Sequence, residues 1–212
     1  MRGTSGTSGM SGMRGMSGMS GTSDLEHRVK TVLGPILELP DPRPRLSAYH
    51  DMPSAIFRYD PEDELELRRQ VSLLETRLGQ KGKRVSRISL AECLEEALLS
   101  QRPMEDWVAA EREQGVETLV ETIHAVLSEY QPLVDLVARR LPEDPDPLRD
   151  VVFILRTGSL FPAYRTFSLL EQLKGQVSVP AILFYPGVLD GAAGLRFMGV
   201  LDAEHNYRPK IL

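Results

Sequence analysis

Two apolar runs decide the fold, Val151-Val152-Phe153-Ile154-Leu155 and, further along the chain, Ala181-Ile182-Leu183-Phe184-Tyr185. Neither run alternates with polar residues, which is typical of strands that are covered on both faces of a sheet. The first run breaks at Thr157-Gly158-Ser159 and the second at Pro186-Gly187. Two such strands in succession predict neighbours in a parallel sheet, which need a crossover connection between them.

The segment between the two runs has the pattern of that crossover helix. Pro162 suits a first helical turn, because its missing N–H has no helical partner there anyway. Tyr164, Phe167, Leu170 and Leu173 follow at helical spacing, and Gly175 is a typical helix end. The pattern therefore predicts a βαβ unit with its helix over residues 162–174.

Three further stretches read as strands of the same sheet. Residues 55–59 form an apolar run, and residues 84–88 alternate as a half-buried strand near an edge would. Residues 195–200 follow a glycine-rich loop and suit an antiparallel edge strand. We therefore expect an α/β protein with a mostly parallel three-layer sheet of four to five strands.

Helical patterns fill most of the remaining chain. A first helix starts at residue 24 and is expected to end at Gly34-Pro35, before an extended proline-rich connector over residues 39–44. Asp60 and Ser89 are placed to cap two more helices. Three consecutive helices over about residues 103–141 break the alternation of strand and helix, so we expect a helical insertion there.

The domain organisation follows from these patterns. In residues 1–23, glycine recurs every third position from Gly3 without proline, which predicts a flexible low-complexity tail of natural or engineered origin. Residues 24–212 are then expected to form one domain that carries the insertion.

Composition and charge narrow the function classes. Residues 24–147 hold 16 basic and 25 acidic side chains, a net charge of −9, whereas residues 148–212 carry +2. This balance argues against DNA coating, which needs a concentrated basic surface. No apolar run is long enough to span a bilayer, so we expect no direct membrane contact. The one cysteine, Cys93, lies on the apolar face of a predicted helix, which fits a reducing, cytoplasmic setting.

The turn at Arg156-Thr157-Gly158-Ser159 occupies the place of a phosphate-binding loop. It offers one glycine and no lysine, and Pro162 removes an N–H donor, so nucleotide hydrolysis is not expected. A vestigial anion site using Arg156, Arg165 and a helix N-terminus stays open, as does a turn that serves only close packing.

Catalytic and metal sites find little support in the sequence. A hydrolase would use Ser159 or His205, but no Gly-x-Ser-x-Gly elbow presents a serine. His27 and His124 lie on predicted helices and are expected far from the turn, and His50 lies in a proline-flanked connector. Asp190, Asp202, Glu204 and His205 form a polar cluster that suits a metal only weakly. The sequence therefore predicts no enzyme, no metal ion and no cofactor.

Aromatic and arginine side chains gather in the last quarter of the chain. Most belong to the expected core, but several are of the types that anchor protein interfaces. The candidate partner-binding or anion-binding residues are Arg156, Ser159, Tyr164, Arg165, Arg196, Tyr207 and Arg208.

Blocks within residues 150–212 also carry a family resemblance. They are Val151-Val152-Phe153-Ile154-Leu155-Arg156-Thr157-Gly158-Ser159-Leu160-Phe161-Pro162, then Tyr164-Arg165, Ser168-Leu169-Leu170-Glu171-Gln172-Leu173, Phe184-Tyr185-Pro186-Gly187, Leu195-Arg196-Phe197-Met198-Gly199 and Asn206-Tyr207-Arg208. In these blocks and their order the chain resembles the BrxB family of bacteriophage exclusion (BREX) systems.

The resemblance implies a non-enzymatic accessory or scaffold component of an anti-phage defence system. It implies a PglZ-like BREX component as partner, with other BREX proteins as further candidates, and it transfers no catalytic residue. Nucleic-acid contact by this chain alone is not expected. The alternative is a degenerate nucleotide- or nucleic-acid-binding module that does not hydrolyse its ligand.

Overall fold

The computed structural model describes residues 24–47, 53–191, 194–205 and 209–212. Its sheet has the order β2-β3-β4-β1-β6, and β5 pairs with β4. The main strands are β1 (Ser54–Tyr59), β2 (Arg84–Ser89), β3 (Asp150–Leu155) and β4 (Ala181–Asp190). All four run parallel, with β2 at an edge, which confirms the predicted α/β class and mostly parallel sheet.

Two short strands complete the sheet. β5 (Gly194–Phe197) pairs antiparallel with the second half of β4, as expected for that segment. β6 (Lys210–Ile211) runs parallel to β1 and is not among the strands that the sequence predicts. The sheet therefore has six strands rather than four to five. Moreover, β4 does not end at Pro186-Gly187, because β5 supplies a new partner for residues 187–190.

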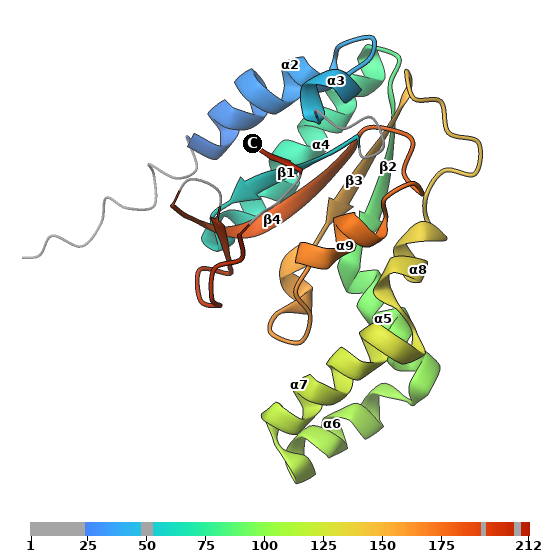
Figure 1. Cartoon of the computed structure of the whole chain (residues 1–212), viewed down its shortest axis with the longest axis vertical. Coiled ribbons are helices and arrows are strands. Elements are labelled where there is room, and N and C mark those ends of the chain that lie inside the picture. The colour runs from blue at the N-terminus through green and yellow to red at the C-terminus, as the bar shows by residue number, and fades with distance from the viewer. Residues whose placement is uncertain (1–23, 48–52, 192–193, 206–208) are drawn as a thin grey trace, which may run out of the picture.

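The sheet is covered on both faces (Figure 1). On one face, Phe57, Phe153 and Phe184 pack under α4 (Glu64–Gln80) and the N-terminal helix. The ring of Phe184 lies 5.6 Å from that of Phe57 and 5.3 Å from that of Phe153. On the other face, α5 (Leu90–Gln101), α8 (Leu133–Ala138) and α9 (Phe167–Gln172) cover a second apolar cluster. Both central strands are thus apolar on both sides, as their sequences indicate.

The caps of α4 and α5 lie where the sequence places them. The Asp60 carboxylate accepts a hydrogen bond from the Glu62 N–H at 3.1 Å, within the turn η2 (Pro61–Asp63) that opens α4. The Ser89 hydroxyl accepts from the Glu92 N–H at 3.4 Å. Each cap satisfies an N–H group that has no partner inside its helix, so strand and helix join without a long loop.

Two expectations about residues 24–46 are wrong, one on where the N-terminal helix ends and one on the connector after it. The helix is the first of these. It continues through Gly34-Pro35 as residues 24–37, with a π-helical segment η1 (Val29–Leu33) before α2 (Gly34–Leu37). The wider π turn makes room for the proline ring, which would clash with a carbonyl in a regular α-helix. In the expected extended connector, α3 (Arg43–Leu46) forms one helical turn with Pro44 in its first turn, where proline is tolerated.

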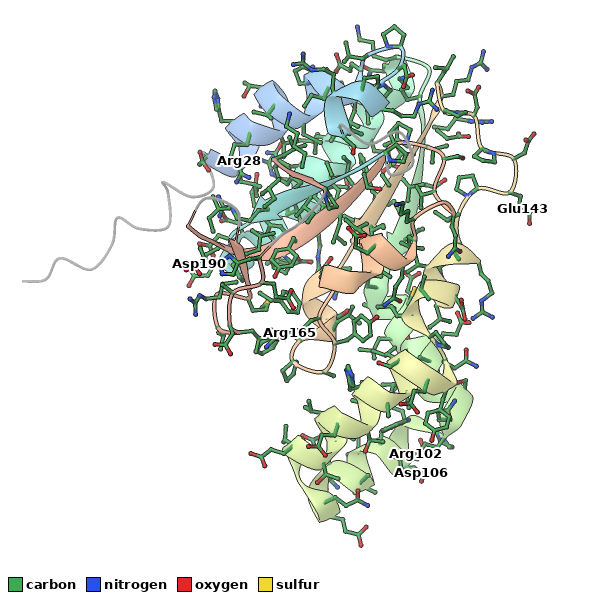
Figure 2. The ribbon with its side chains drawn as sticks, viewed as in Figure 1. Arg28, Arg102, Asp106, Glu143, Arg165 and Asp190 are labelled. Carbon is green, nitrogen blue, oxygen red and sulfur yellow. The ribbon has the colours of Figure 1, made fainter. Side chains whose placement is uncertain are left out.

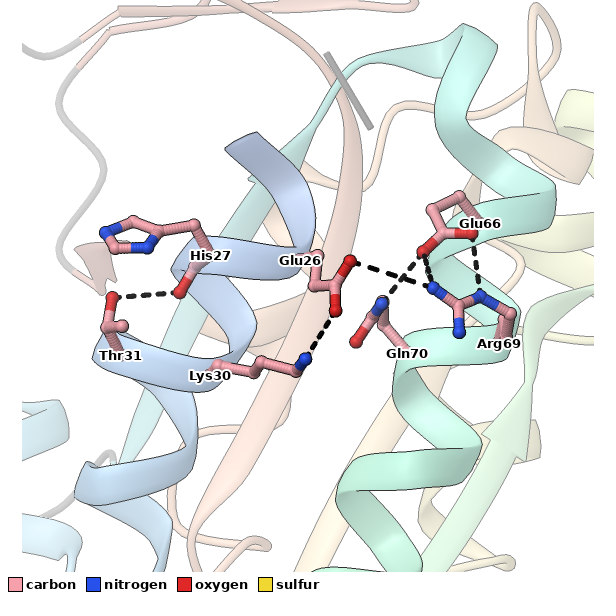
Figure 3. A network of polar contacts seen from close by, with 7 residues as sticks. All are labelled: Glu26, His27, Lys30, Thr31, Glu66, Arg69 and Gln70. Carbon is pink, nitrogen blue, oxygen red and sulfur yellow. Dashed lines mark hydrogen bonds and ion pairs between the residues drawn. The ribbon is translucent and has the colours of Figure 1, made fainter. Parts of the chain in front are cut away.

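A polar network holds this N-terminal helix to α4 (Figure 3). Arg69 on α4 lies 3.8 Å from the Glu26 carboxylate and 2.6 Å from that of Glu66. Lys30 pairs with Glu26 from the next helical turn, and the Gln70 side chain donates to Glu66 at 2.8 Å. The two helices also share apolar contacts, and the polar network adds a second set of contacts that orients one helix beside the other.

Residues 103–141 form helices, as predicted. They are α6 (Met104–Gln114), α7 (Val116–Ala125), the π-helical η3 (Val126–Tyr130) and α8. α8 rests on the sheet, whereas α6 and α7 project from it as a hairpin (Figure 1). None of the helices in the described ranges is long and apolar enough to span a membrane.

The connection from β3 to β4 is less helical than predicted. A 3-10 turn, η4 (Thr157–Leu160), precedes an irregular segment, and the helix α9 covers only Phe167–Gln172. Phe161 is extended, with φ −72° and ψ 137°, because the residue before a proline is sterically kept from the α region. Pro162 therefore does not begin the helix.

Candidate functional site

The turn after β3 closes on itself rather than opening toward a ligand. The N–H groups of Ser159 and Phe161 donate to the carbonyls of Arg156 and Gly158 at 3.0 and 3.1 Å. The buried Thr157 hydroxyl donates to the Phe184 carbonyl at 2.6 Å and ties the turn to β4. Because these donors are used internally, they do not form the cradle of N–H groups that a phosphate needs.

Gly158 packs against β4 and the segment after β5. A Cβ added at Gly158 would lie 3.4 Å from Met198 Sδ and 3.5 Å from Pro186 Cγ, which are ordinary van der Waals distances to apolar atoms. An alanine would therefore fit at this position. The contacts are compatible with a turn that serves close packing, one of the interpretations that the sequence left open.

A small cavity lies at the carboxyl ends of β1, β4 and β3. β1 leads into α4 on one face and β3 into α9 on the other, so this is a point where crossovers diverge, a usual place for ligands in α/β sheets. The cavity has a volume of about 210 Å³. Its lining includes Tyr59, Glu64, Arg68, Arg156 and Ser159.

Glu64 occupies the centre of this arrangement and was missed by the sequence analysis. Its carboxylate lies 2.9 Å from Arg68 Nε and 3.4 Å from Arg156 Nε, and it accepts a hydrogen bond from the Tyr59 hydroxyl. Burial, together with the Glu64 hydrogen bond, raises the pKa of Tyr59, so the phenol stays protonated and donates. An anion would have to displace Glu64 from both arginines.

The adjoining cavity shows the same balance of charge. It encloses about 260 Å³ and shares Glu64, Arg68 and Arg156 with its neighbour. Arg87, on its wall, pairs with Glu75 of α4. Each arginine around these two cavities thus faces a glutamate, although Arg68 and Arg156 share Glu64, so a phosphate that binds here would have to displace a carboxylate from its arginine partners.

Arg165 and Arg196, two further candidate arginines, do not line these two cavities (Figure 2 labels Arg165 and Asp190). Arg165 Nη1 lies 3.5 Å from the Glu204 carboxylate, and Arg196 Nη2 lies 3.5 Å from that of Asp190. Backbone hydrogen bonds of 2.9 Å in both directions between Leu195 and Glu204 hold the last segment against β5. We call the residues Arg165, Asp190, Arg196 and Glu204 the Arg165–Glu204 surface.

This surface joins two parts of the chain that are distant in sequence. The Arg165 side chain is 45% exposed and that of Arg196 37% exposed, so both guanidinium groups remain accessible beside their carboxylates. Arg156 and Arg165 bind different glutamates, and they do not converge on one anion site.

The other predicted site residues divide as follows. Tyr164 is buried, 6% exposed, and belongs to the core. The Ser159 hydroxyl donates to the Arg156 carbonyl at 2.7 Å. Tyr207 and Arg208 lie outside the described residues.

His124 is closer to the turn than expected. Its Nδ1–H donates to the Ala163 carbonyl at 2.9 Å, and its ring lies 6.0 Å from that of Tyr164. Both histidine and tyrosine border a cavity of about 390 Å³ that also includes Arg165. The contact arises because α7 lies against the irregular segment before α9, and no local sequence pattern indicates it.

The described candidates for catalysis or metal binding do not come together in a site of either kind. His205 Nε2 lies 3.8 Å from Asp190, and within the described ranges no histidine hydrogen-bonds Ser159. No three His, Cys, Asp or Glu side chains among the described residues gather in a way that could hold a metal ion. What the arrangement offers is charged side chains that are accessible for contacts.

Two comparisons with known proteins agree on one family. A family model described as BREX protein BrxB matches residues 86–212, which include the hairpin and the Arg165–Glu204 surface. A protein of Bacillus cereus (strain H3081.97) named BREX protein BrxB is 26% identical over 155 residues, covering 72% of this chain and 79% of that protein. No solved structure matches the chain.

Proposed function

The chain belongs to the BrxB family of BREX proteins, and we propose that it is a non-enzymatic accessory component that binds a PglZ-like partner in the cytoplasm. Membership of a BREX family implies other BREX components as partners. The PglZ-like component is the partner that the BrxB resemblance suggests. We propose that contact is made through the Arg165–Glu204 surface.

The observation that carries this proposal is the convergence of two family-like blocks on that surface. The ion pair between Arg165 and Glu204 links the segment before α9 to the segment after β5, although the two are far apart in sequence. Arginines that are accessible and held in position are frequent anchors of protein interfaces. A partner carboxylate can share either guanidinium group, since each side chain stays more than one-third exposed.

The experiment is co-purification from cells that express the PglZ-like component of the same gene cluster with an affinity tag. We expect this chain to be retained in stoichiometric amount through a salt wash that removes weak electrostatic contacts. Absence of a complex with each BREX component of the cluster, tagged in turn, would refute the proposal.

The alternative function, nucleotide or nucleic-acid binding, rests on the cavity at the carboxyl ends of the strands. Titration with ATP and with short DNA duplexes separates the two functions. We expect no saturable binding tighter than the roughly 1–100 µM of non-specific electrostatic association, because Glu64 pairs with both Arg68 and Arg156 and Glu75 pairs with Arg87, so a phosphate would have to displace these carboxylates. Tighter saturable binding would favour the alternative.

A further inference from the structure

The hairpin of α6 and α7 is anchored to α5 at its base, and the last turns of α7 also contact the core and the segment before α9. The Trp107 Nε1–H donates to the Leu98 carbonyl of α5 at 3.1 Å, and the guanidinium of Arg102 lies 3.9 Å above the Trp107 ring. Beyond this anchor the two helices extend away from the sheet, as Figures 1 and 2 show. Among the described residues, their outer parts pack mainly on each other.

The helix α7 is apolar but buries none of its residues. Val116, Leu119, Val120 and Ile123 fall on one stripe, because successive residues of a helix are about 100° apart. Leu119 and Ile123 lean against the core at the inner edge of the stripe. Val116 is 58% exposed, and Val120 is only half-buried. The outer edge of the stripe is therefore an apolar surface without a partner in the described chain.

The same hairpin is strongly acidic. Residues 103–130, which comprise the hairpin and the π-helical turn η3 that follows it, carry seven acidic side chains and a single arginine. None of the seven takes part in an ion pair within the part of the chain that the structure describes. They are Glu105, Asp106, Glu111, Glu113, Glu117, Glu121 and Glu129. The hairpin thus presents an unneutralised negative charge beside its exposed valines.

This charge decides which class of partner fits. Nucleic acids and anionic membranes are repelled by it. Symmetric pairing of two hairpins would set the same acidic patch against itself, because a two-fold interface uses the same surface on both copies. A helix with an apolar stripe flanked by lysine or arginine meets both requirements, since it covers the valines and neutralises the glutamates.

We propose that α6 and α7 are two helices of an intermolecular three-helix bundle, completed by a basic amphipathic helix of a protein partner. The incoming helix packs along Val116 and Val120, and its basic residues lie beside Glu117 and Glu121, which are exposed. This surface is separate from the Arg165–Glu204 surface and does not depend on which BREX protein binds there.

The test uses three synthetic peptides of about 18 residues, long enough to form a helix in isolation. One has an apolar leucine stripe flanked by lysines, one the same stripe flanked by glutamates, and one the lysine composition in scrambled order. Each is titrated into the full chain and followed by calorimetry. We expect saturable binding of the first peptide only, with at least tenfold weaker binding of the other two.

Variants locate the site. Val116→Ser with Val120→Ser, and separately Glu117→Lys with Glu121→Lys, should each weaken binding at least tenfold without loss of fold by circular dichroism. The matched control is Leu65→Ser on α4, because Leu65 is an apolar residue 76% exposed elsewhere on the surface. Equal affinity for the three peptides, absence of binding, or equal loss in the control would each overturn the proposal. Concentration-dependent dimerisation abolished by the valine variant would overturn it in favour of a second copy. Because the probes are not BREX proteins, these outcomes are independent of the co-purification result.

Discussion

A buried lysine joins three segments of the fold, and its replacement is the clearest test of the packing. The Lys83 ammonium donates to the carbonyls of Leu39, Pro40 and Leu148 at 2.6, 3.1 and 2.7 Å. The residue is 8% exposed, and burial lowers the pKa of its ammonium group. Lys83→Met keeps the length of the side chain and removes all three hydrogen bonds.

The magnitude follows from two opposing contributions. Hydrogen bonds to a charged group stabilise by roughly 1.5–3 kcal/mol each, but removing the ammonium also removes the cost of its burial. Leu148 is 52% exposed and Leu39 37%, so water can reach part of the vacated site. We expect a net loss of about 3 kcal/mol. For a chain of this size, that is a fall in Tm of about 6–12 °C.

The assay is thermal and urea unfolding of Lys83→Met beside Lys81→Met. Lys81 is the matched control because it is an exposed lysine in the same connection between α4 and β2, two positions away. The control should unfold within about 2 °C of the parent chain, as surface substitutions usually do. Equal midpoints for the two variants would show that the three carbonyl contacts do not stabilise the fold.

Three further predictions concern stability and reactivity. Burial opposes ionisation of Asp150, but hydrogen bonds from Arg84 and from the Asp146 N–H outweigh it and lower the pKa of the carboxyl. The stabilisation by the ionised Asp150 carboxylate is thus fully present above the unfolded pKa of about 3.9 and lost as pH falls through the lower folded value. Asp150→Asn should therefore flatten the acid limb of a stability–pH curve below about pH 4. An unchanged acid limb would contradict this. Gly187→Ala places a Cβ 2.4 Å from the Arg196 carbonyl oxygen and should lower the free energy of unfolding in urea by about 1–3 kcal/mol. Gly79→Ala on α4 meets no atom within 4 Å and should raise it by about 0.5–1 kcal/mol. An unchanged free energy for the Gly187 variant would refute the close approach of β4 and β5. Burial raises the pKa of the Cys93 thiol to about 11. Alkylation of this thiol at pH 8 should therefore proceed only at the rate at which the chain unfolds. Rapid labelling of the native chain would show that Cys93 is not buried under α5.

The parts of the fold that the sequence predicts are those set by local chemistry. The runs at β3 and β4 are apolar on both faces because both faces are covered, and this can be read without knowing what covers them. Asp60 and Ser89 cap their helices through contacts within three residues. Local steric rules also explain the failures. Pro162 keeps Phe161 extended, and this steric effect outweighs the helical spacing of the residues that follow. Pro35 is a strong signal for the end of a helix, whereas the π turn that lets the helix continue past it has no comparable sequence signature.

The candidate site was less accessible to sequence reasoning because its contacts are long-range. Arg165 was identified by residue type, but its pairing with Glu204 depends on β5 bringing the last segment back to β4. Glu64 forms an ion pair with Arg156, which is 92 positions away in the sequence. From the sequence alone, Glu64 looks like any carboxylate in the first turn of a helix. The two-residue strand β6 is too short to have a pattern, and it is recognisable only by its pairing with β1.

The central claim is that the Arg165–Glu204 surface binds a PglZ-like partner, and the most direct test is the affinity of the purified pair for two matched variants. Arg165→Glu removes the 3.5 Å pair with Glu204, and the control Arg149→Glu removes a 3.7 Å pair with Asp146 at the opposite end of β3. Exposed pairs contribute roughly 0–1 kcal/mol, so both variants should melt within about 4 °C of the parent chain. The account predicts that Arg165→Glu weakens binding at least tenfold and that Arg149→Glu leaves it unchanged. Equal affinities for the two variants, or a large loss of stability in Arg165→Glu alone, would contradict it.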